Sequence, residues 1–253
     1  MIEICAIASG SNGNCYYIGN ENSAILVDAG LSGKQVFLRM EQKNLNSEKI
    51  KAIFITHEHN DHFRCVRTLS KKLNVPVYLT PKTLNNSWKK HRPKEIVFFN
   101  HGDVVTVNDF LVHTFLKKHD AAEPCSFRIE CNGINVGIFT DIGEPCENVK
   151  HHLRQCQALF LESNYDENML WAGTYPYILK MRINSEIGHL SNIQAKTLIK
   201  DYQHPDLQVL LLSHISKENN SPEIALSVFE EFTNKFTVAA TNRYEVGDVY
   251  VII

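Results

Sequence analysis

The sequence predicts an α/β fold in which two β-sheets pack against each other and helices flank them. Short apolar segments bounded by Gly, Asn or Asp dominate the first two thirds of the chain, and helical patterns are interleaved with them. Strand and helix also alternate in the last third, with no linker, repeat or low-complexity tract. We therefore expect one domain over residues 1–253, with two packed sheets and not a single parallel sheet.

The expected strands are short apolar runs. In chain order they are Ile2–Ala8, Tyr16–Ile18, Ala24–Val27, Ala52–Ile55, Val75–Leu79, Ile96–Phe99, Phe110–Phe115, Phe127–Ile129, Val136–Phe139, Val209–Leu212, Thr237–Ala240 and Val249–Ile253. Asn132 and Gly133 tolerate the positive φ of a tight turn, so Ser126–Cys131 and Ile134–Thr140 should pair as an antiparallel hairpin.

Five helices are expected between these strands. They are Lys34–Lys43, Phe63–Leu73, Val149–Gln155, Ile193–Tyr202 and Pro222–Phe232. Ser191 and Asn192 form a cap-like pair before the fourth helix. Ser221 is the expected N-cap of the fifth, which places Pro222 at its first helical position.

Composition narrows the class of protein. Hydrophobic residues make up 43% of the chain and charged residues 21%, as in folded globular proteins. The net charge of −2 creates no global positive field, so nucleic-acid binding would need a local patch or bound metal ions. The seven cysteines are scattered and lack a CxxC spacing, which indicates reduced thiols. Without a leader-like start or a run near the roughly 20 apolar residues of a membrane span, we expect a soluble cytoplasmic protein with no membrane partner.

The strongest functional pattern is His57-Glu-His59-Asn-Asp61-His62, which directly follows an apolar strand. His57 and His59, at positions i and i+2, point to the same side of an extended segment and can bind one ion. Asp61 and His62 then face a second ion. Imidazole and carboxylate ligands suit zinc-like ions at catalytic sites, where one coordination position stays open to water. A lone HxH pair is often a polar loop, but this denser pattern predicts a metal site.

A site for two ions needs ligands from distant segments, and His119, Asp141 and His214 each stand where a predicted strand ends. A rigid strand fixes the loop that follows it, which is why strand ends collect site residues. Asp141, in Thr-Asp-Ile-Gly, could bridge two ions. Other histidines lack this setting and are expected to have no metal role: His91, His101, His113, His151, His152 and His204.

In order and spacing, these motifs resemble the successive metal motifs of metallo-β-lactamase fold hydrolases, and the likeness spans nearly the whole chain. The resemblance implies a four-layer αββα metallo-β-lactamase sandwich that binds two divalent metal ions, Zn²⁺ or Mn²⁺. By motif it assigns one ion to His57, His59 and His119, the other to Asp61, His62 and His214, and the bridging position to Asp141.

Four further stretches narrow the resemblance: Ser9-Gly-Ser11-Asn12-Gly-Asn14-Cys15, Leu161-Glu162-Ser-Asn-Tyr165-Asp166, Gly188-His189-Leu-Ser191-Asn192 and His214-Ile-Ser-Lys217-Glu-Asn219-Asn220. Together they resemble the YycJ-like branch, whose members are regarded as DNA exonucleases working from the 5′ end. Glu162 and His189 also resemble a pair in tRNA 3′-processing ribonucleases, where a glutamate supports a histidine beside the leaving group. Leu190 departs from that pattern, because those enzymes have a small hydroxyl residue there.

The resemblance implies a phosphodiesterase or nuclease with a DNA substrate and a metal-bridging hydroxide as nucleophile. We expect Asp61 to orient this hydroxide in addition to binding metal. His189, oriented by Glu162, is expected to donate a proton to the departing oxygen. Candidates for contacts to substrate phosphates are Ser11, Asn12, Asn14, Asn219 and Asn220.

Two alternatives stay open at this level. A hydrolase of small esters, thioesters or lactams would use the same metal ligands, and the nearly neutral charge mildly favours it, whereas Glu162 with His189 favours the nuclease. A metal-stabilised binding or sensor domain is the non-enzyme alternative, and the presence of all seven ligand positions argues against it. The sequence indicates no particular oligomeric state.

Overall fold

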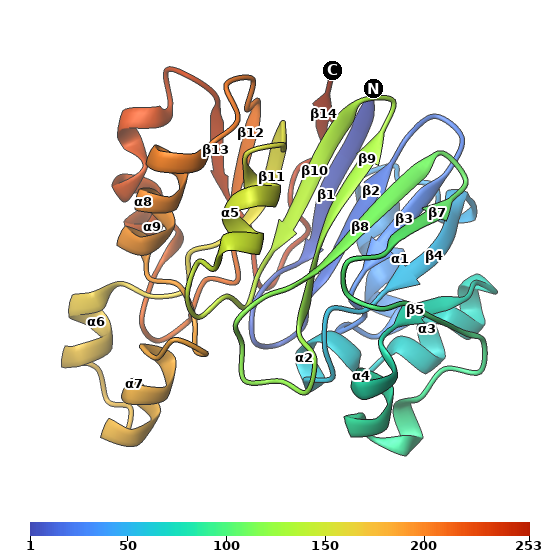
Figure 1. The fold of residues 1–253 in the computed structure, drawn as a ribbon, viewed down its shortest axis with the longest axis horizontal. Coiled ribbons are helices and arrows are strands. Elements are labelled where there is room, and N and C mark those ends of the chain that lie inside the picture. Colours follow the sequence, from blue (N-terminus) through green and yellow to red (C-terminus); the bar gives the residue numbers. More distant parts are fainter.

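Fourteen strands form two seven-stranded sheets in the computed structural model, which describes residues 1–253 (Figure 1). The first sheet has the order β14-β1-β2-β3-β4-β5-β6. Its strands are β1 (Ile2–Ala8), β2 (Cys15–Gly19), β3 (Ala24–Val27), β4 (Ile50–Phe54), β5 (Val77–Leu79), β6 (Ile96–Phe98) and β14 (Tyr250–Ile252). The strands from β14 to β3 pair antiparallel, and those from β3 to β6 pair parallel.

The second sheet repeats this division, with the order β13-β12-β11-β10-β9-β8-β7. Its strands are β7 (Val104–Val107), β8 (Phe110–Leu116), β9 (Cys125–Cys131), β10 (Ile134–Phe139), β11 (Ala158–Glu162), β12 (Val209–Ser213) and β13 (Thr237–Ala240). The strands from β7 to β10 pair antiparallel and those from β10 to β13 parallel. Each sheet therefore has several strands whose carboxyl ends reach one edge.

Nine helices connect the strands. They are α1 (Gly33–Gln42), α2 (Asn60–Phe63), α3 (Val66–Leu73), α4 (Pro81–Asn86), α5 (Glu147–Leu153), α6 (Glu167–Ala172), α7 (Tyr177–Ile183), α8 (Asn192–Tyr202) and α9 (Pro222–Val228), with short 3₁₀ turns η1 (Ser47–Lys49), η2 (Lys89–His91) and η3 (Glu230–Phe232). None of these helices has the length and apolar character required to cross a membrane.

Three buried clusters show the layering. One holds side chains from both sheets, such as Phe54 and Phe127, whose rings pack edge to face with centroids 5.6 Å apart. A second joins the first sheet to Val36 of α1 and Leu69 of α3. The third joins the second sheet to α5, α8 and α9, for example through Leu198. The order helix, sheet, sheet, helix confirms the four-layer αββα sandwich expected from the sequence.

Several local expectations are confirmed. Asn132 and Gly133 have φ of 52° and 80°, and Cys131 pairs with Ile134 across the predicted two-residue turn. The Ser191 side chain accepts a hydrogen bond at the start of α8 in a full capping box. Ser221 caps α9, with Pro222 in its first turn. These features depend on a few neighbouring residues, and the sequence shows all of them.

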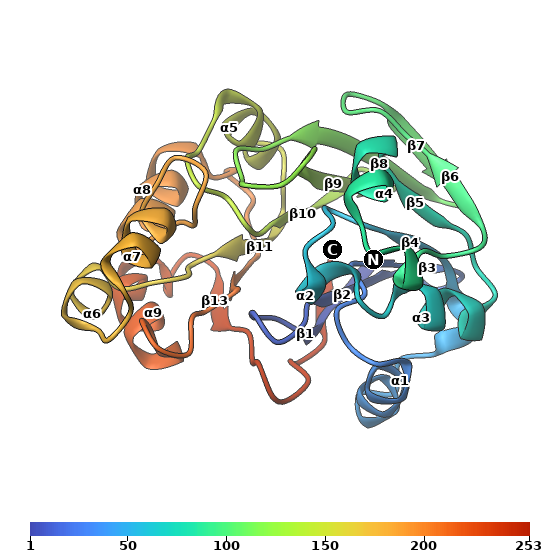
Figure 2. The same cartoon turned by 90° about the horizontal axis from the view of Figure 1, so that it is seen from below.

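Other elements differ from expectation. The helix expected over Phe63–Leu73 begins only at Val66, as α3, and Phe63 instead ends the separate helix α2. The two helices are separated at Cys65, because its N–H donates to the carbonyl of Ala29 in the loop after β3 (3.0 Å). The last helix ends at Val228 and continues only as η3. Strands β7 and β11 and helices α4, α6 and α7 were not predicted. α6 and α7 extend from the end of the molecule below α8 and α9 (Figures 1 and 2).

Candidate metal centre

The carboxyl ends of strands from both sheets converge on one edge of the sandwich, near α2 (Figure 2). The HxHxDH segment follows β4, and His119 lies in the loop after β8. Asp141 follows β10 and His214 follows β12. Parallel strands deliver their following loops to a common edge, which is how residues up to 157 positions apart in the chain meet here.

Backbone hydrogen bonds hold the HxHxDH segment against the neighbouring loops. The Asp61 carbonyl accepts from Asn14 N (2.7 Å), and the His62 carbonyl accepts from Ala29 N (2.7 Å). Gly30 makes this approach possible, since a Cβ atom there would lie 1.7 Å from the Asp61 carbonyl oxygen. The ligand segment is thus fixed by main-chain contacts before any metal binds.

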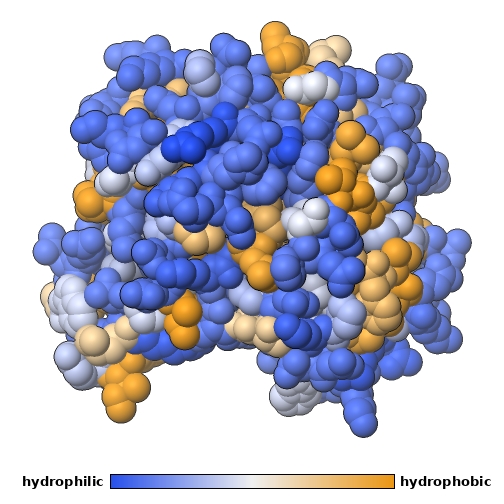
Figure 3. Space-filling view, viewed as in Figure 1, coloured by the Kyte–Doolittle hydropathy of each residue, from blue (hydrophilic) through white to orange (hydrophobic).

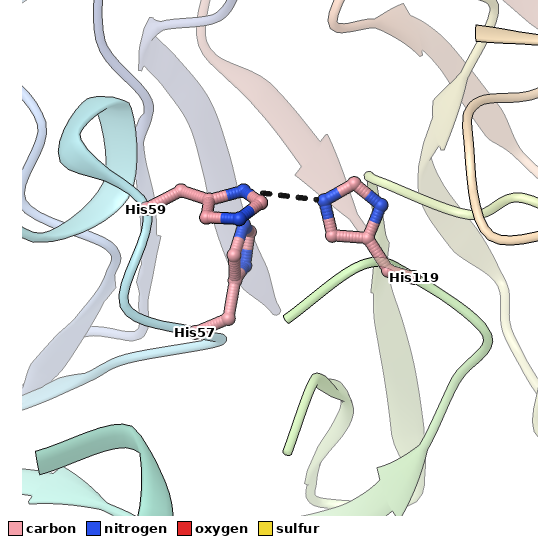
Figure 4. A group of neighbouring side chains, drawn as sticks. All are labelled: His57, His59 and His119. Carbon is pink, nitrogen blue, oxygen red and sulfur yellow. Dashed lines mark hydrogen bonds between the residues drawn. The ribbon is translucent and has the colours of Figure 1, made fainter. Parts of the chain in front are cut away.

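One group of candidate ligands consists of His57, His59 and His119, whose imidazoles turn toward one another (Figure 4). His57 and His59 come from the loop after β4, and His119 approaches from the second sheet. His59 Nδ1 lies 3.4 Å from His119 Nε2. The three ligand nitrogens lie within 4.8 Å of one another, a separation that one ion can span.

A second group consists of Asp61, His62 and His214, whose ligand atoms also lie within 4.8 Å of one another. Asp141 lies between the two groups. Its Oδ2 is 3.1 Å from His62 Nε2, and its Oδ1 is 3.9 Å from His119 Nε2. Asp141 can therefore reach an ion on either side, and the structure brings together all seven ligand positions expected from the sequence.

Hydrogen bonds at Nδ1 direct the other imidazole nitrogen into the centre. His62 Nδ1 donates to Asp28 (2.7 Å), His119 Nδ1 to the Gly188 carbonyl (3.1 Å), and His214 Nδ1 to Glu162 (2.9 Å). The Nε2 atoms of His57 and His214 are buried and have no hydrogen-bond partner in the protein. Unpaired buried nitrogens beside carboxylates fit metal ligation, and these outer contacts are those typical of metal-binding histidines.

Burial and charge set the protonation of the centre. Burial lowers the pKa of His119 to about 4 and holds the pKa of His57 well below its ordinary value, so both are neutral near pH 7. Neutral imidazole is the form that binds metal. Burial also opposes protonation of His214, but Asp141, Asp61 and Glu162 outweigh it and raise the pKa of His214 to about 10. An ion bound at His214 would take the place of that proton.

The profile of the Metallo-beta-lactamase superfamily matches residues 8–167 of the chain, which include the HxHxDH segment, His119 and Asp141. The chain belongs to the metallo-β-lactamase superfamily. Among curated superfamily proteins, it is similar to Exodeoxyribonuclease YycJ of Bacillus anthracis, with 34% identity over 250 residues, 98% of this chain and 95% of the relative. It is also 34% identical to Exodeoxyribonuclease WalJ of Streptococcus pneumoniae, over 87% of this chain and 83% of the relative.

Solved metallo-β-lactamase folds resemble the whole chain. YhfI from Bacillus subtilis has a TM-score of 0.73 at 17% identity and covers 99% of this chain and 100% of its own. The short form of human tRNase Z has a TM-score of 0.67 at 15% identity, with 99% of both chains covered. At these identities the likeness shows the fold alone. The curated relatives, the family and the histidine and aspartate cluster support the metal-dependent hydrolase that the sequence predicted.

Glu162 and His189 lie together at the rim of the candidate metal centre. His189 Nδ1 donates to Glu162 Oε1 (2.8 Å), and the His189 side chain is 20% exposed. Burial disfavours the charged form of Glu162, but the His189 charge and the hydrogen bonds from His189 and His214 lower its pKa to about 2. Leu190 does not disturb the pair, because Leu190 contributes its backbone N–H to Glu162 Oε2 (3.2 Å).

The sequence analysis did not predict the hydrogen bonds that orient the candidate ligand histidines at Nδ1. Asp28, after β3, is completely buried and accepts hydrogen bonds from His62 Nδ1 and from Thr56 N (2.9 Å) and its hydroxyl (3.0 Å). Glu162 was expected to orient His189, and its further contact to His214 was not predicted. A signal was present for Asp28, since it follows a strand and precedes Ala-Gly, as Asp141 follows one and precedes Ile-Gly.

Backbone strain marks the same positions. Asp28, Asp141 and His214 have φ of 65°, 54° and 55°, and every other residue except glycine with positive φ is an asparagine. Left-handed conformations are tolerated by Asn and less readily by other residues, so their presence at three strand exits of the centre is typical of functional sites.

The residues proposed for phosphate contacts divide into two sets. Ser11 is exposed and Asn12 half-buried, both beside Arg243: the Ser11 hydroxyl accepts from Arg243 Nη2 (3.2 Å), and Asn12 Nδ2 donates to the Arg243 carbonyl (3.3 Å). The buried set is engaged within the protein. Asn14 Nδ2 donates to Asp61 (3.2 Å), and Asn220 Nδ2 donates to the Ser163 carbonyl (3.0 Å).

Asn219 is also buried, and its Nδ2 has no hydrogen-bond partner. Its backbone carbonyl accepts from Asp166 N (2.8 Å), which ties the loop after β12 to the start of α6. The side chains of Asn14 and Asn220 therefore hold the loops around the centre, while Ser11, Asn12 and Asn219 remain our candidates for substrate contact.

Asp28→Asn is expected to weaken metal affinity about 10- to 100-fold, because the amide keeps the shape of the side chain but cannot accept from both His62 and Thr56. Asparagine tolerates positive φ, so the fold should be retained. Titration with Mn²⁺ against a competing chelator measures the change. Asp201→Asn, at an exposed position of α8, is the matched control. Equal affinities of Asp28→Asn and the wild type would show that Asp28 does not support His62.

Proposed function

We propose that this protein is a metal-dependent exodeoxyribonuclease that hydrolyses phosphodiester bonds from the 5′ end of DNA. The observation that carries the proposal is the Glu162–His189 pair, which stands at the rim of a centre with two groups of metal ligands. A leaving alkoxide of a phosphodiester needs a proton, whereas the leaving groups of thioesters do not need one to the same extent. The names of the relatives, both exodeoxyribonucleases, support the same activity.

The centre suits two divalent ions of the Zn²⁺ or Mn²⁺ class. His57, His59 and His119 would hold one, and Asp61, His62 and His214 the other, with Asp141 between them. When bound, such ions supply Lewis acidity, which acidifies water and offsets charge on phosphoryl oxygens. The chain contributes geometry, because the Nδ1 contacts of His62, His119 and His214 turn the Nε2 atoms of these rings toward the centre.

Asp61 and His189 carry the proton-handling roles. The Asp61 carboxylate is 21% exposed and receives a hydrogen bond from Asn14, so one oxygen is fixed while the side chain still reaches solvent, where it can orient a water molecule. His189 uses Nδ1 for Glu162, which leaves Nε2 free to donate to the departing oxygen. Glu162, buried and ionised, keeps His189 in this tautomer.

We place the reaction in the cytoplasm. All seven cysteines are free thiols, and five of them are buried. Burial raises the pKa of Cys5 and of Cys125 to about 12, so these thiols are un-ionised and inert at neutral pH. Free thiols are the normal state in a reducing compartment.

The activity is tested with end-labelled single- and double-stranded DNA and RNA, in the presence of Zn²⁺ or Mn²⁺. We expect mononucleotides to be released from the 5′ end of DNA, with slower or no release from RNA of the same sequence. Turnover of thioesters or lactams, with none on any phosphodiester, would replace the nuclease by a small-molecule hydrolase. No turnover of any substrate by protein shown to contain two ions would support a binding or sensor domain.

A further inference from the structure

A segment that directly follows the metal motif concentrates the positive charge of the chain. Residues 62–94, called here the cationic segment, contain nine of the 26 lysines and arginines and none of the 28 aspartates and glutamates. The nine are Arg64, Arg67, Lys71, Lys72, Lys82, Lys89, Lys90, Arg92 and Lys94. The nearly neutral charge of the protein therefore conceals a local excess of nine positive charges on one stretch of chain.

These charges are exposed and mostly unpaired. All nine except Arg92 have exposed side chains, and Arg92 is half-buried. Only Lys82 makes an ion pair, with Glu123 at 3.2 Å. Elsewhere surface cations such as Lys43, Lys118, Arg182 and Lys196 do pair with carboxylates. An uncompensated group of cations creates a positive local field that attracts polyanions.

The cationic segment extends outward from the metal centre. It starts at the candidate ligand His62, and Arg64 Nε donates to the Gly30 carbonyl (2.7 Å), next to the loop that contacts Asp61. Lys82, in α4, reaches Glu123 in the loop that carries His119. In the space-filling view the lower edge of the molecule is notched between the α6–α7 projection and the projection that carries α4 (Figure 3).

The surface has features of both phosphate and base recognition. A hollow of about 340 Å³ is lined mostly by polar and charged side chains, among which three cations, Arg67, Lys71 and Lys94, outnumber one carboxylate, Glu95. Beyond it, Trp88 is 60% exposed, and Lys90 Nζ lies 4.7 Å from its ring centroid. Arg67 Nη1 donates to the Lys90 carbonyl (3.3 Å), which fastens η2 to α3. An exposed indole among lysines is typical of surfaces on which unstacked bases lie.

We propose that the surface of α3, α4 and η2 binds the single-stranded part of a DNA substrate as it leads away from the metal centre. This inference rests on the proposed nuclease function. Arg67, Lys71, Lys89, Lys90 and Lys94 contact phosphates, and Trp88 stacks on a base. The strand is single because the bases of a duplex are stacked on each other and present no free face to Trp88.

The test measures binding of a fluorescent single-stranded 20-mer of DNA by anisotropy in EDTA, where cleavage is absent. For the double variant Lys89→Ala, Lys90→Ala we expect affinity about tenfold weaker, and a plot of log affinity against log salt that is shallower by about 1.4, or about 0.7 for each lost phosphate contact. Trp88→Ala should weaken binding about tenfold on the single strand and much less on a blunt duplex.

The matched control is Lys51→Ala, Lys200→Ala, which removes two exposed lysines at the far ends of β4 and α8 and should leave affinity unchanged. With metal supplied, the Lys89, Lys90 variant should hydrolyse a nitrophenyl phosphodiester at the wild-type rate. Unchanged affinity and salt slope in that variant would overturn the proposal, as would equal loss on duplex and single strand for Trp88→Ala. Failure of the nuclease function itself would show separately, as no cleavage of DNA by the wild type.

Discussion

Replacing His189 with alanine is expected to slow DNA hydrolysis about 10²- to 10⁴-fold while both metal ions stay bound. His189 is not a member of either three-residue ligand group, and its Nδ1 is engaged by Glu162 at 2.8 Å. Its ring lies beside those of His119 and His214, with centroids 5.3 and 5.2 Å away. From this position Nε2 can protonate a departing oxygen, and the alanine variant loses only that function.

Comparing the rate loss on two substrates distinguishes a general-acid role of His189 from a general loss of structure. A nitrophenyl phosphodiester has a leaving group that needs little protonation, so the deficit of His189→Ala should be much smaller on it than on DNA. His101→Ala, at an exposed position outside the candidate ligand groups, is the control. An equal loss on both substrates would contradict the general-acid role. Loss of metal from His189→Ala would instead make His189 a ligand, together with Asp141, Glu162 and His214, which also lie within reach of a single ion.

Asp141→Asn is expected to reduce the metal content below two ions per chain and to slow hydrolysis about 10²- to 10³-fold. Asp141 is the carboxylate that approaches both ligand groups, at 3.1 Å from His62 Nε2 and 3.9 Å from His119 Nε2. Removing its charge leaves the imidazoles in place but takes away the carboxylate that can reach an ion on either side, and with it the Lewis acidity of any ion that is lost. The φ of 54° suits asparagine, so the variant should fold.

Elemental analysis after dialysis against excess metal gives the ion count, and steady-state rates on labelled DNA give the loss of activity. Asp206→Asn, in the exposed connection before β12, controls for the removal of an aspartate charge. Retention of two ions with turnover within a few-fold of the wild type would show that Asp141 does not bridge. Thermal unfolding of the metal-free variant measures any destabilisation caused by the loss of the Asp141 charge, separately from the loss of a metal ligand.

The candidate ligand set could be predicted from the sequence because each motif is local. His57 and His59 are two positions apart after a strand, and Asp141 and His214 stand directly at strand ends, so a strand and its following loop predict where these side chains go. The turn at Asn132-Gly133 and the cap at Ser191 are local in the same sense. Such features involve a few consecutive residues, and backbone geometry over that distance depends little on the rest of the chain.

The supporting contacts were decided by the tertiary structure. Asp28 meets His62 across 34 positions, and Glu162 meets His214 across 52, only because β3 lies beside β4 and β11 beside β12 in the two sheets. The division of the expected helix at Cys65 likewise depends on a hydrogen bond to Ala29. The composition of the cationic segment is visible in the sequence, but its lack of ion-pair partners is not. Pairing between distant segments depends on how strands order and sheets stack, and no local pattern encodes that order.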